Sequence, residues 1–208
     1  MARAIIFATK NGGKLRELRH LCEAFGVEVL GLGDDAPDVV EDGATFEENA
    51  LKKARAIATW SNKLTIADDS GLEVDALGKR PGVHSARFAG EHGNDAANIN
   101  RIFAELQPFT RPSRGFTARF RCALAMIDPA TGREHVTSGS CEGEIALEPR
   151  GSNGFGYDPI FVVKEATTAL EDRTMAELSA DEKAAVSHRG QAMRAMIPTL
   201  ASWLRGAT

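Results

Sequence analysis

The sequence predicts a mixed α/β protein, and three observations point to that class. Residues 4–8 are a short, continuous apolar run that is typical of a buried strand, and a helical pattern follows them after a polar, glycine-containing segment. A second helix and strand follow over 45–67. Residues 116–126 alternate strictly between apolar and polar side chains, as a strand with one buried face does. This order favours a mixed central sheet flanked by helices.

The first half of the chain contains clear start and stop signals. Apolar residues recur at helical spacing in the first helix: Leu15, Leu18, Leu21, Cys22 and Phe25. Gly26 is a suitable stop for that helix. Thr45 and Glu48 have the spacing of a capping box at the start of the second helix. Residues 64–67 then predict a short strand that ends at the polar segment 68–71.

The second half predicts further strands and two helices. A turn at 128–132 follows the alternating strand, one or two strands return over 135–146, and residues 159–163 add another. A capping box at 179–182 indicates a short helix that ends at about Val186. Pro198 lies inside the last helix and predicts a kink or local break there. Without repeats or a low-complexity linker, residues 1–208 are expected to form a single domain.

Composition narrows the class of protein. The net charge of −4 gives no general attraction to nucleic acid, so bound phosphate has to meet local Lys or Arg side chains or helix ends. Cys22, Cys122 and Cys141 are odd in number and widely spaced, which predicts buried or semi-buried free thiols in a reducing compartment. No run reaches the ~18 apolar residues of a membrane span. Residues 1–14 do not resemble a signal peptide, and we expect a cytoplasmic protein that binds neither membrane nor nucleic acid.

A polar, glycine-containing segment follows the first strand and is a candidate phosphate site. It consists of Thr9, Lys10, Asn11, Gly12, Gly13 and Lys14. Glycines let backbone N–H groups approach an anion, a helix start adds partial positive charge, and Lys14 adds a full charge. The spacing differs from a Walker sequence. A purely structural connector is the alternative for this segment taken by itself.

Adjacent carboxylates at Asp68 and Asp69 are a candidate metal site. They repel each other unless a cation or proton is present, and they follow a strand in a position where α/β proteins bind ligands. Hard oxygen ligands suit Mg²⁺. Neighbours on an extended chain point in opposite directions, so both need not face one ligand. Glu41 is a possible third acid. The alternatives are a solvated turn for the pair and an ordinary surface acid for Glu41.

Two further segments could contact a nucleotide. Residues 151–159 are glycine-rich and contain Phe155 and Tyr157, and an aromatic ring on such a loop can stack on a base for roughly 1–3 kcal/mol. A hairpin loop with packed aromatic rings is the alternative. Residues 187–190 precede the last helix, where Ser187 can cap the helix and Arg189 can bind an anion or a carbonyl oxygen. Lys183 precedes them by about one helical turn.

Together these segments resemble the inosine/xanthosine triphosphate pyrophosphatase family, which removes deaminated purines from the nucleotide pool. Six separated motifs occur in one order. They are residues 5–14, Thr45-Phe46 with Glu48-Asn49-Ala50, residues 67–72, Pro81-Gly82 with Ser85-Ala86-Arg87, residues 154–159 and residues 187–190. The likeness runs from about residue 4 to residue 204. Lys79 departs from the family pattern, because the family usually has a second glycine there after Gly78. This difference concerns only the shape of the local loop.

The resemblance implies an elongated protein with an active-site cleft between two lobes, acting as a homodimer with Mg²⁺. It implies hydrolysis of dITP, ITP and XTP to the monophosphate and pyrophosphate. Glu41 and Asp69 match the metal-binding acids, with Asp69 as catalytic base and Asp68 beside them. The substrate contacts that it implies are Thr9, Lys10, Asn11, Gly12, Gly13, Lys14, Ser70, Phe155, Gly156, Tyr157, Asp158, Lys183, His188 and Arg189.

Three other functions compete with this one. A septum-inhibitor type of pyrophosphatase acts on modified pyrimidine nucleotides, but residues 187–190 argue against it. A regulatory nucleotide-binding protein would not need the acidic cluster, and a nucleic-acid-binding module would need a basic stripe. We also expect hydrogen-bond donors near His188 and on Arg189 to accept the six-oxo group of inosine and to reject the amino group of adenosine.

Overall fold

The computed structural model describes residues 3–110, 112, 115–164, 170 and 172–206. The chain divides into two compact units. The first contains Met1–Asp69, Cys122–Gly139 and His188–Thr208, and the second contains Ser70–Arg121 and Ser140–Ser187. Each unit is assembled from separate stretches of sequence, so the chain passes between them several times. The prediction of one domain over the whole chain stays a prediction.

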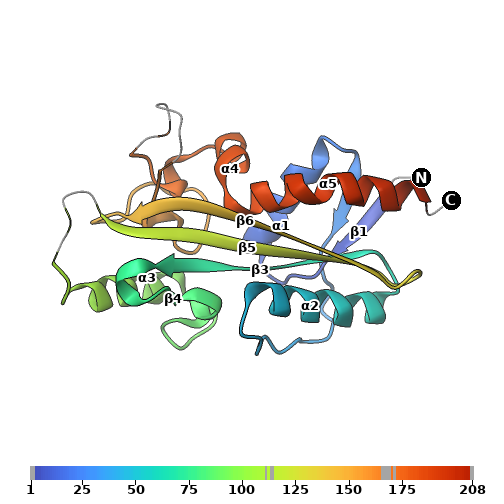
Figure 1. Ribbon diagram of the computed structural model, residues 1–208, viewed down its shortest axis with the longest axis horizontal. Helices are drawn as coiled ribbons and strands as arrows, with labels where there is room; N and C mark the ends of the chain where they lie inside the picture. Colours follow the sequence, from blue (N-terminus) through green and yellow to red (C-terminus); the bar gives the residue numbers. More distant parts are fainter. Residues whose placement is uncertain (1–2, 111, 113–114, 165–169, 171, 207–208) are drawn as a thin grey trace. The chain divides into compact units, whose positions relative to one another are not determined.

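The first unit is built around parallel strands. Its elements are β1 (Arg3–Phe7), α1 (Gly12–Glu23), β2 (Val27–Leu30), α2 (Phe46–Ser61), the start of β3 (Thr65–Val74), the end of β5 (Phe116–Asp128), the start of β6 (Arg133–Ile145) and α5 (His188–Gly206). Strand β1 pairs in parallel with β2 and with β3. Helix α2 covers one face of the strands, and α1 and α5 lie on the other (Figure 1).

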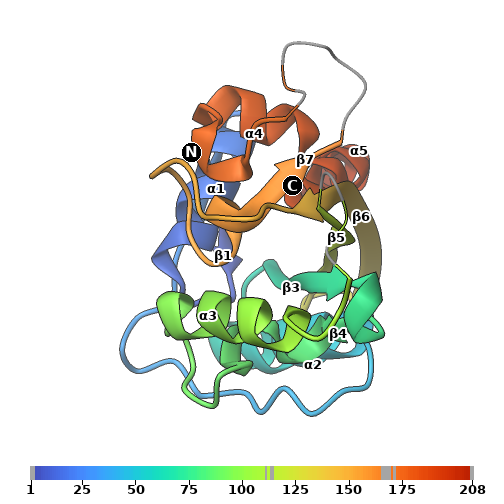
Figure 2. The ribbon, with the colours of Figure 1, turned by 90° about the vertical axis from the view of Figure 1, so that its left-hand side faces the viewer.

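The second unit carries the remaining strands and helices. Besides the rest of β3, β5 and β6, it contains the 3-10 helix η1 (Asp75–Leu77), β4 (Arg80–Pro81), η2 (Gly82–Arg87), α3 (Asp95–Leu106), η3 (Asp158–Ile160), β7 (Phe161–Val163), η4 (Met175–Glu177) and α4 (Ala180–Val186). Strand β4 pairs antiparallel with β3, and β7 pairs antiparallel with β6. Helices α3 and α4 lie on opposite sides of these strands (Figure 2).

The strands follow the order β2-β1-β3-β5-β6-β7, with β4 added beside β3. Parallel pairs involve β1, and antiparallel pairs involve β4 and β7. The predicted mixed α/β class with flanking helices is therefore confirmed. The expected elongation and cleft concern the placement of the two units, and they stay predictions.

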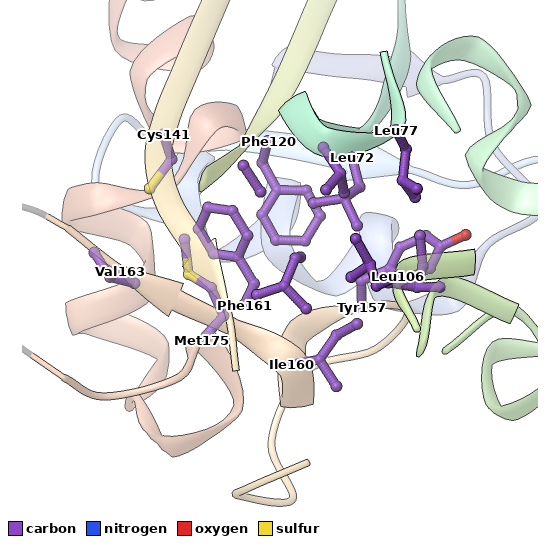
Figure 3. Packing of buried hydrophobic residues seen from close by; sticks show 14 of the residues in the cluster. Leu72, Leu77, Leu106, Phe120, Cys141, Tyr157, Ile160, Phe161, Val163 and Met175 are labelled. Atoms are coloured by element: carbon purple, nitrogen blue, oxygen red, sulfur yellow. The ribbon is translucent and has the colours of Figure 1, made fainter. Parts of the chain in front are cut away.

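Each unit has its own hydrophobic core. The core of the first unit includes Ile5, Phe7, Leu18, Ile66, Leu124, Met126 and Met196. The core of the second brings together side chains from β3, β5, β7, α3 and η4, including Leu72, Leu106, Phe120, Phe161 and Met175 (Figure 3). The rings of Phe120 and Phe161 lie 4.4 Å apart between centroids. Cys22, Cys122 and Cys141 are buried free thiols, as predicted.

Several helix ends confirm the sequence signals, and one differs in detail. The Thr45 side chain accepts the Glu48 N–H at 3.1 Å, as an N-cap does. The Glu48 carboxylate, however, accepts the N–H of Ala44 at 2.7 Å and not that of Thr45. The box at Ser179 and Glu182 is complete in both directions.

Two predictions about element boundaries need correction, and one open alternative is resolved. Strand β3 does not end at residue 68 but continues to Val74, because cationic side chains stabilise its two buried carboxylates. Residues 133–145 form one returning strand. Helix α5 is continuous past Pro198, so the expected local break does not occur. Strand β2 and helix α3 were not predicted.

Membrane insertion of a helix has no support in the described part of the chain. No helix there is both long enough and apolar enough to cross a bilayer.

Candidate active site

Asp68 and Asp69 lie in the middle of β3, within the first unit, and their side chains face opposite sides of the strand. The Asp68 carboxylate contacts side chains of α1 and α5, whereas the Asp69 carboxylate contacts side chains of α2. These helices lie on opposite faces of the sheet (Figure 1). The alternation expected for neighbours on an extended chain is thus confirmed. The alternative of a solvated turn is wrong, because both carboxylates are buried.

Asp68 is held by two cationic side chains. Arg189 donates to Oδ2 of Asp68 from Nη2 at 2.8 Å and from Nε at 3.2 Å. Nζ of Lys14 lies 3.1 Å from Oδ1 of the same carboxylate. Nη1 of Arg189 donates to Glu17. The guanidinium is only 1% exposed and is thus bound to two carboxylates at once.

This surrounding charge fixes the ionisation state of Asp68. Burial by itself opposes the charged form, but the positive charges of Lys14, Arg189 and Lys53 outweigh it. They hold the pKa of the Asp68 carboxyl well below its usual range. Asp68 is therefore a permanent carboxylate that orients Lys14 and Arg189.

Asp69 lies in a different environment, formed by α2 and by the loop before it. The Asn49 side-chain amide donates to Oδ2 of Asp69 at 2.9 Å. Nζ of Lys53 lies 2.8 Å from Oε2 of Glu41 and 4.0 Å from Oδ1 of Asp69. Asn49 is itself fixed, because its Oδ1 accepts the N–H of Gly43 at 2.8 Å. Helical spacing of four residues brings Asn49 and Lys53 to one face of α2.

The chemistry of Asp69 differs from that of Asp68 accordingly. Burial raises the pKa of Asp69 to about 6, and the neighbouring Glu41 carboxylate contributes to the rise. Lys53, Lys14 and the Asn49 hydrogen bond oppose the shift without cancelling it. A carboxylate with a pKa near the working pH can accept a proton and release it again, which is the requirement for a general base.

The predicted phosphate segment forms the start of α1. Asn11 is the N-cap, and its side chain accepts the N–H of Lys14 at 3.0 Å. The helix starts at Gly12, so Gly12, Gly13 and Lys14 form its first turn. First-turn N–H groups have no carbonyl partner within their own helix and carry partial positive charge. The backbone here can therefore bind an anion, and Nζ of Lys14 belongs to the same part of the first unit.

Other predicted phosphate contacts are more exposed. Nζ of Lys10 pairs with Asp38 at 2.6 Å, with over half of the lysine side chain exposed to solvent. The Thr9 hydroxyl accepts the N–H of Asn11 at 3.1 Å and helps to shape the turn into α1.

The predicted nucleoside loop lies in the second unit and is organised by Asp158. Oδ2 of Asp158 accepts the N–H of Phe155 at 2.8 Å and also pairs with Nζ of Lys183. That ammonium lies 5.0 Å from the centroid of the Phe155 ring, a cation–π distance. A side chain at Gly154 would place its Cβ 2.0 Å from Asp158 Oδ2, and φ there is +79°. Glycine is therefore required at this position.

The same loop is also anchored at its next two residues. The N–H of Gly156 donates to Oδ2 of Asp95 at 2.7 Å. The Tyr157 hydroxyl donates to the carbonyl oxygen of Ser85 at 2.8 Å. A hydrogen bond thus fixes each residue from Phe155 to Asp158, and the Tyr157 ring is packed in the core of the second unit, as the structural alternative expected of an aromatic ring in this loop.

Two further residues, Ser70 and His188, were predicted to contact substrate. Ser70 follows Asp69 in β3 as the first residue of the second unit, and His188 starts α5 and is 5% exposed. Their contact with substrate stays a prediction.

Sequence reasoning missed three residues of this site: Glu17, Asn49 and Lys53. Asn49 and Lys53 lie among the apolar positions of α2, and a polar residue on the buried face of a predicted helix is the signal that could have identified them. Glu17 is separated from Arg189 by 172 positions, so its role becomes visible only in the fold.

Glu41 and Asp69 fit a Mg²⁺ site by the chemistry of their donors. Both carboxylates face the ammonium of Lys53, which shows that they present oxygen atoms to a common cation. Within the described ranges, no group of three acidic, His or Cys side chains gathers into a metal cluster. Mg²⁺ needs only one or two protein carboxylates when phosphate and water complete its shell, so two are sufficient.

Comparisons with known proteins identify the family to which the chain belongs. The family model described as the Ham1 family matches residues 5–199. A dITP/XTP pyrophosphatase of Bacillus licheniformis is 50% identical, covering 92% of this chain and 95% of the relative. Among solved structures, a HAM1 protein from Coxiella burnetii has a TM-score of 0.81 at 39% identity, covering 96% of this chain and 99% of that one. The Staphylococcus aureus Ham1 protein has a TM-score of 0.76 at 41% identity, covering 99% of this chain and all of that one. The chain belongs to the Ham1 family.

Proposed function

We propose that the protein hydrolyses dITP, ITP and XTP to the nucleoside monophosphate and pyrophosphate. The observation that carries this proposal is the environment of Asp69, a buried carboxyl that accepts from Asn49 at 2.9 Å and faces the Lys53 ammonium together with Glu41. The Bacillus licheniformis relative, which is 50% identical, is a dITP/XTP pyrophosphatase, and this supports the substrate class.

In this proposal Asp69 is the general base that takes a proton from the attacking water. Asn49 holds Oδ2 of the carboxylate at 2.9 Å, and Oδ1 is proposed to accept the proton. Lys53 counters the negative charge as the proton moves. A general base of this kind contributes about 10²–10⁴-fold to the rate.

Glu41 and Asp69 are the residues that would hold Mg²⁺. When bound there, the ion supplies neutralisation of phosphate charge and a lower pKa of the attacking water. The chain supports this role by keeping the two carboxylates together and by supplying further positive charge from Lys53.

The start of α1 is proposed to bind the triphosphate. Backbone N–H groups of the first helical turn and the Lys14 ammonium provide positive partial and full charges for it. Thr9, Lys10 and Asn11 shape or flank the turn. Positive charge close to the bridging oxygen stabilises pyrophosphate as it departs.

Phe155 is proposed to stack on the purine, with the rest of its loop and Lys183 binding the nucleoside. The cation–π contact of Lys183 holds the ring, and Asp158 holds the backbone beside it. Ser70 and His188 are proposed as further substrate contacts. Stacking favours every base, so it cannot select inosine over adenosine.

Selection by the six-oxo group is proposed to use donors at the start of α5. The structure changes the earlier expectation for Arg189, because Nη1, Nη2 and Nε of its guanidinium already donate to Glu17 and Asp68. Because Arg189 is also only 1% exposed, a base oxygen reaches its guanidinium only if the side chain or its surroundings move. A guanidinium reached in this way donates to an acceptor on the base and not to the amino group of adenine.

Pyrophosphate release across a nucleotide panel, with and without Mg²⁺, tests the proposed function. The expected result is rapid release from dITP, ITP and XTP, slow release from dATP and dGTP, and none in EDTA. Faster release from modified pyrimidine nucleotides would instead assign the septum-inhibitor type. Tight binding without release would assign a regulatory nucleotide-binding protein. A homodimer is also proposed, and light scattering that gives a mass near the 22.3 kDa of one chain would contradict it.

A further inference from the structure

The segment 82–98 has no role in the proposed reaction, although Gly82 and residues 85–87 belong to one of the family motifs. It contains η2 and the start of α3, both in the second unit. Its side chains and carbonyl groups make hydrogen bonds to the loop 155–158, which the proposed function assigns to the nucleoside.

Gly156 is the loop residue whose backbone contacts α3. Its φ of +61° lies in the left-handed region, and a Cβ added there would meet nothing within 4 Å, so the side of the residue where a side chain would lie is open. Its N–H donates to Asp95 at 2.7 Å, and this bond fixes the peptide plane that joins it to Phe155.

Asp95 is in turn held in place by its own surroundings. It is the first residue of α3, and the preceding Asn94 caps the helix by accepting the N–H of Ala97 at 3.1 Å. The Asn98 side chain, one turn further on, accepts the N–H of Ala89 at 2.7 Å. The start of α3 is thus tied to the chain that follows η2.

The same platform also holds the neighbour of Gly156. The carbonyl oxygen of Ser85, in η2, accepts the Tyr157 hydroxyl at 2.8 Å. The Ser85 hydroxyl donates to the carbonyl of Gly82 at 2.6 Å and accepts the N–H of Leu72 at 2.9 Å. Two consecutive loop residues are therefore anchored to one rigid segment, Tyr157 through its side chain and Gly156 through its backbone.

We propose that Asp95 is a positioning residue, which fixes the loop 155–158 for nucleotide binding through its hydrogen bond to Gly156. This inference rests on the proposed function of that loop. Since Asp95 acts through Gly156, its loss is expected to weaken substrate binding and to leave the chemical step at Asp69 nearly unchanged.

Steady-state kinetics on dITP with Mg²⁺ test the proposal in three variants. Asp95→Ala removes the acceptor, Asp95→Asn keeps an acceptor oxygen, and Asn94→Ala removes the cap of α3 but keeps the Asp95 carboxylate. Losing one such hydrogen bond is expected to raise KM by about 3–10-fold in Asp95→Ala, with kcat within about twofold. Asp95→Asn is expected to restore KM, and Asn94→Ala to lower the melting temperature and to raise KM by less than Asp95→Ala does.

Amide hydrogen exchange provides a second readout that does not need turnover. Peptides covering 153–158 are expected to exchange faster in Asp95→Ala than in wild type or Asp95→Asn. An unchanged KM and unchanged exchange in Asp95→Ala would overturn the proposal, as would an equal rise of KM in Asn94→Ala. A wild-type enzyme that releases no pyrophosphate from dITP would instead contradict the proposed function itself.

Discussion

Asp68 and Asp69 are neighbours in one strand, yet their carboxyl groups have pKa values shifted in opposite directions. The pKa of Asp68 is lowered, because the charges of Lys14 and Arg189 outweigh the cost of burial. The pKa of Asp69 is raised to about 6, because burial outweighs the more distant Lys53. The strand thus places a permanent anion, Asp68, directly beside a titratable base, Asp69, on the opposite face.

A first prediction concerns the stability cost of Asp69. Its folded pKa of about 6 exceeds the unfolded value of 3.8, so the folded state binds the Asp69 proton more tightly than the unfolded state does. The stability that the protonated carboxyl gives is fully present below the unfolded pKa and is lost as pH rises through the folded pKa. We therefore expect Asp69→Asn to be more stable than wild type at pH 8, by about 1–3 kcal/mol.

Urea unfolding in EDTA, repeated between pH 4 and pH 8, measures this difference. The gain is expected to shrink as pH falls and to vanish near the unfolded pKa. If the extra stability of Asp69→Asn does not change with pH, its cause is packing and not the ionisation of Asp69.

A second prediction concerns Arg189. Removing its side chain leaves the buried carboxylates of Asp68 and Glu17 without their guanidinium, so Arg189→Ala is expected to lose about 3–5 kcal/mol of unfolding free energy. Arg55→Ala is the control, because its pair with Glu134 is exposed and worth at most about 1 kcal/mol.

Activity provides a second measurement on the folded fraction of Arg189→Ala. If Arg189 reads the six-oxo group, hydrolysis of ITP falls far more than residual hydrolysis of ATP. Equal losses on both nucleotides would restrict Arg189 to holding Asp68 and Glu17.

A third prediction concerns the glycines of the nucleoside loop. Gly154→Ala places a methyl group against the Asp158 carboxylate that binds Lys183, at a φ of +79°. We expect kcat/KM to fall by at least about tenfold, because the loop has to move for the methyl group to fit. Gly156→Ala is the matched control, since it also has positive φ but meets no neighbouring atom. Similar losses in both variants would show that backbone strain, and not displacement of Asp158, is the cause.

A fourth prediction concerns Glu182 at the start of α4. Hydrogen bonds from Arg173 and from the Ser179 N–H lower the pKa of Glu182 to about 2. A lowered folded pKa gives stability that is present above the unfolded value of 4.5 and is lost as pH falls toward about 2.

Thermal unfolding of Glu182→Gln tests this dependence. The variant is expected to melt below wild type at pH 7, with a smaller difference at pH 3. Glu148→Gln, at another exposed glutamate, controls for the general effect of removing one negative charge. A deficit of Glu182→Gln that does not change with pH would contradict the ionic origin.

Local patterns made much of this fold predictable. The strand at 4–8, the Ser179 capping box and the alternation over 116–126 each follow from periodicity or helix-end chemistry over a few residues. The length of β3 could not be predicted, because buried carboxylates favour a strand only when cations from distant helices meet them. The role of Asp95 was equally hidden, because its partner Gly156 lies 61 positions away. The resemblance supplied residue roles that local spacing could not.

The products formed from dITP test the central claim most directly. Wild-type protein with Mg²⁺ is predicted to yield dIMP and pyrophosphate in equal amounts, and Asp69→Asn to form them about 10²–10⁴-fold more slowly while remaining folded. Asp75→Asn, at an exposed carboxylate paired with Arg119, is predicted to match wild type. Formation of dIDP with orthophosphate, or turnover by Asp69→Asn within threefold of wild type, would contradict the account.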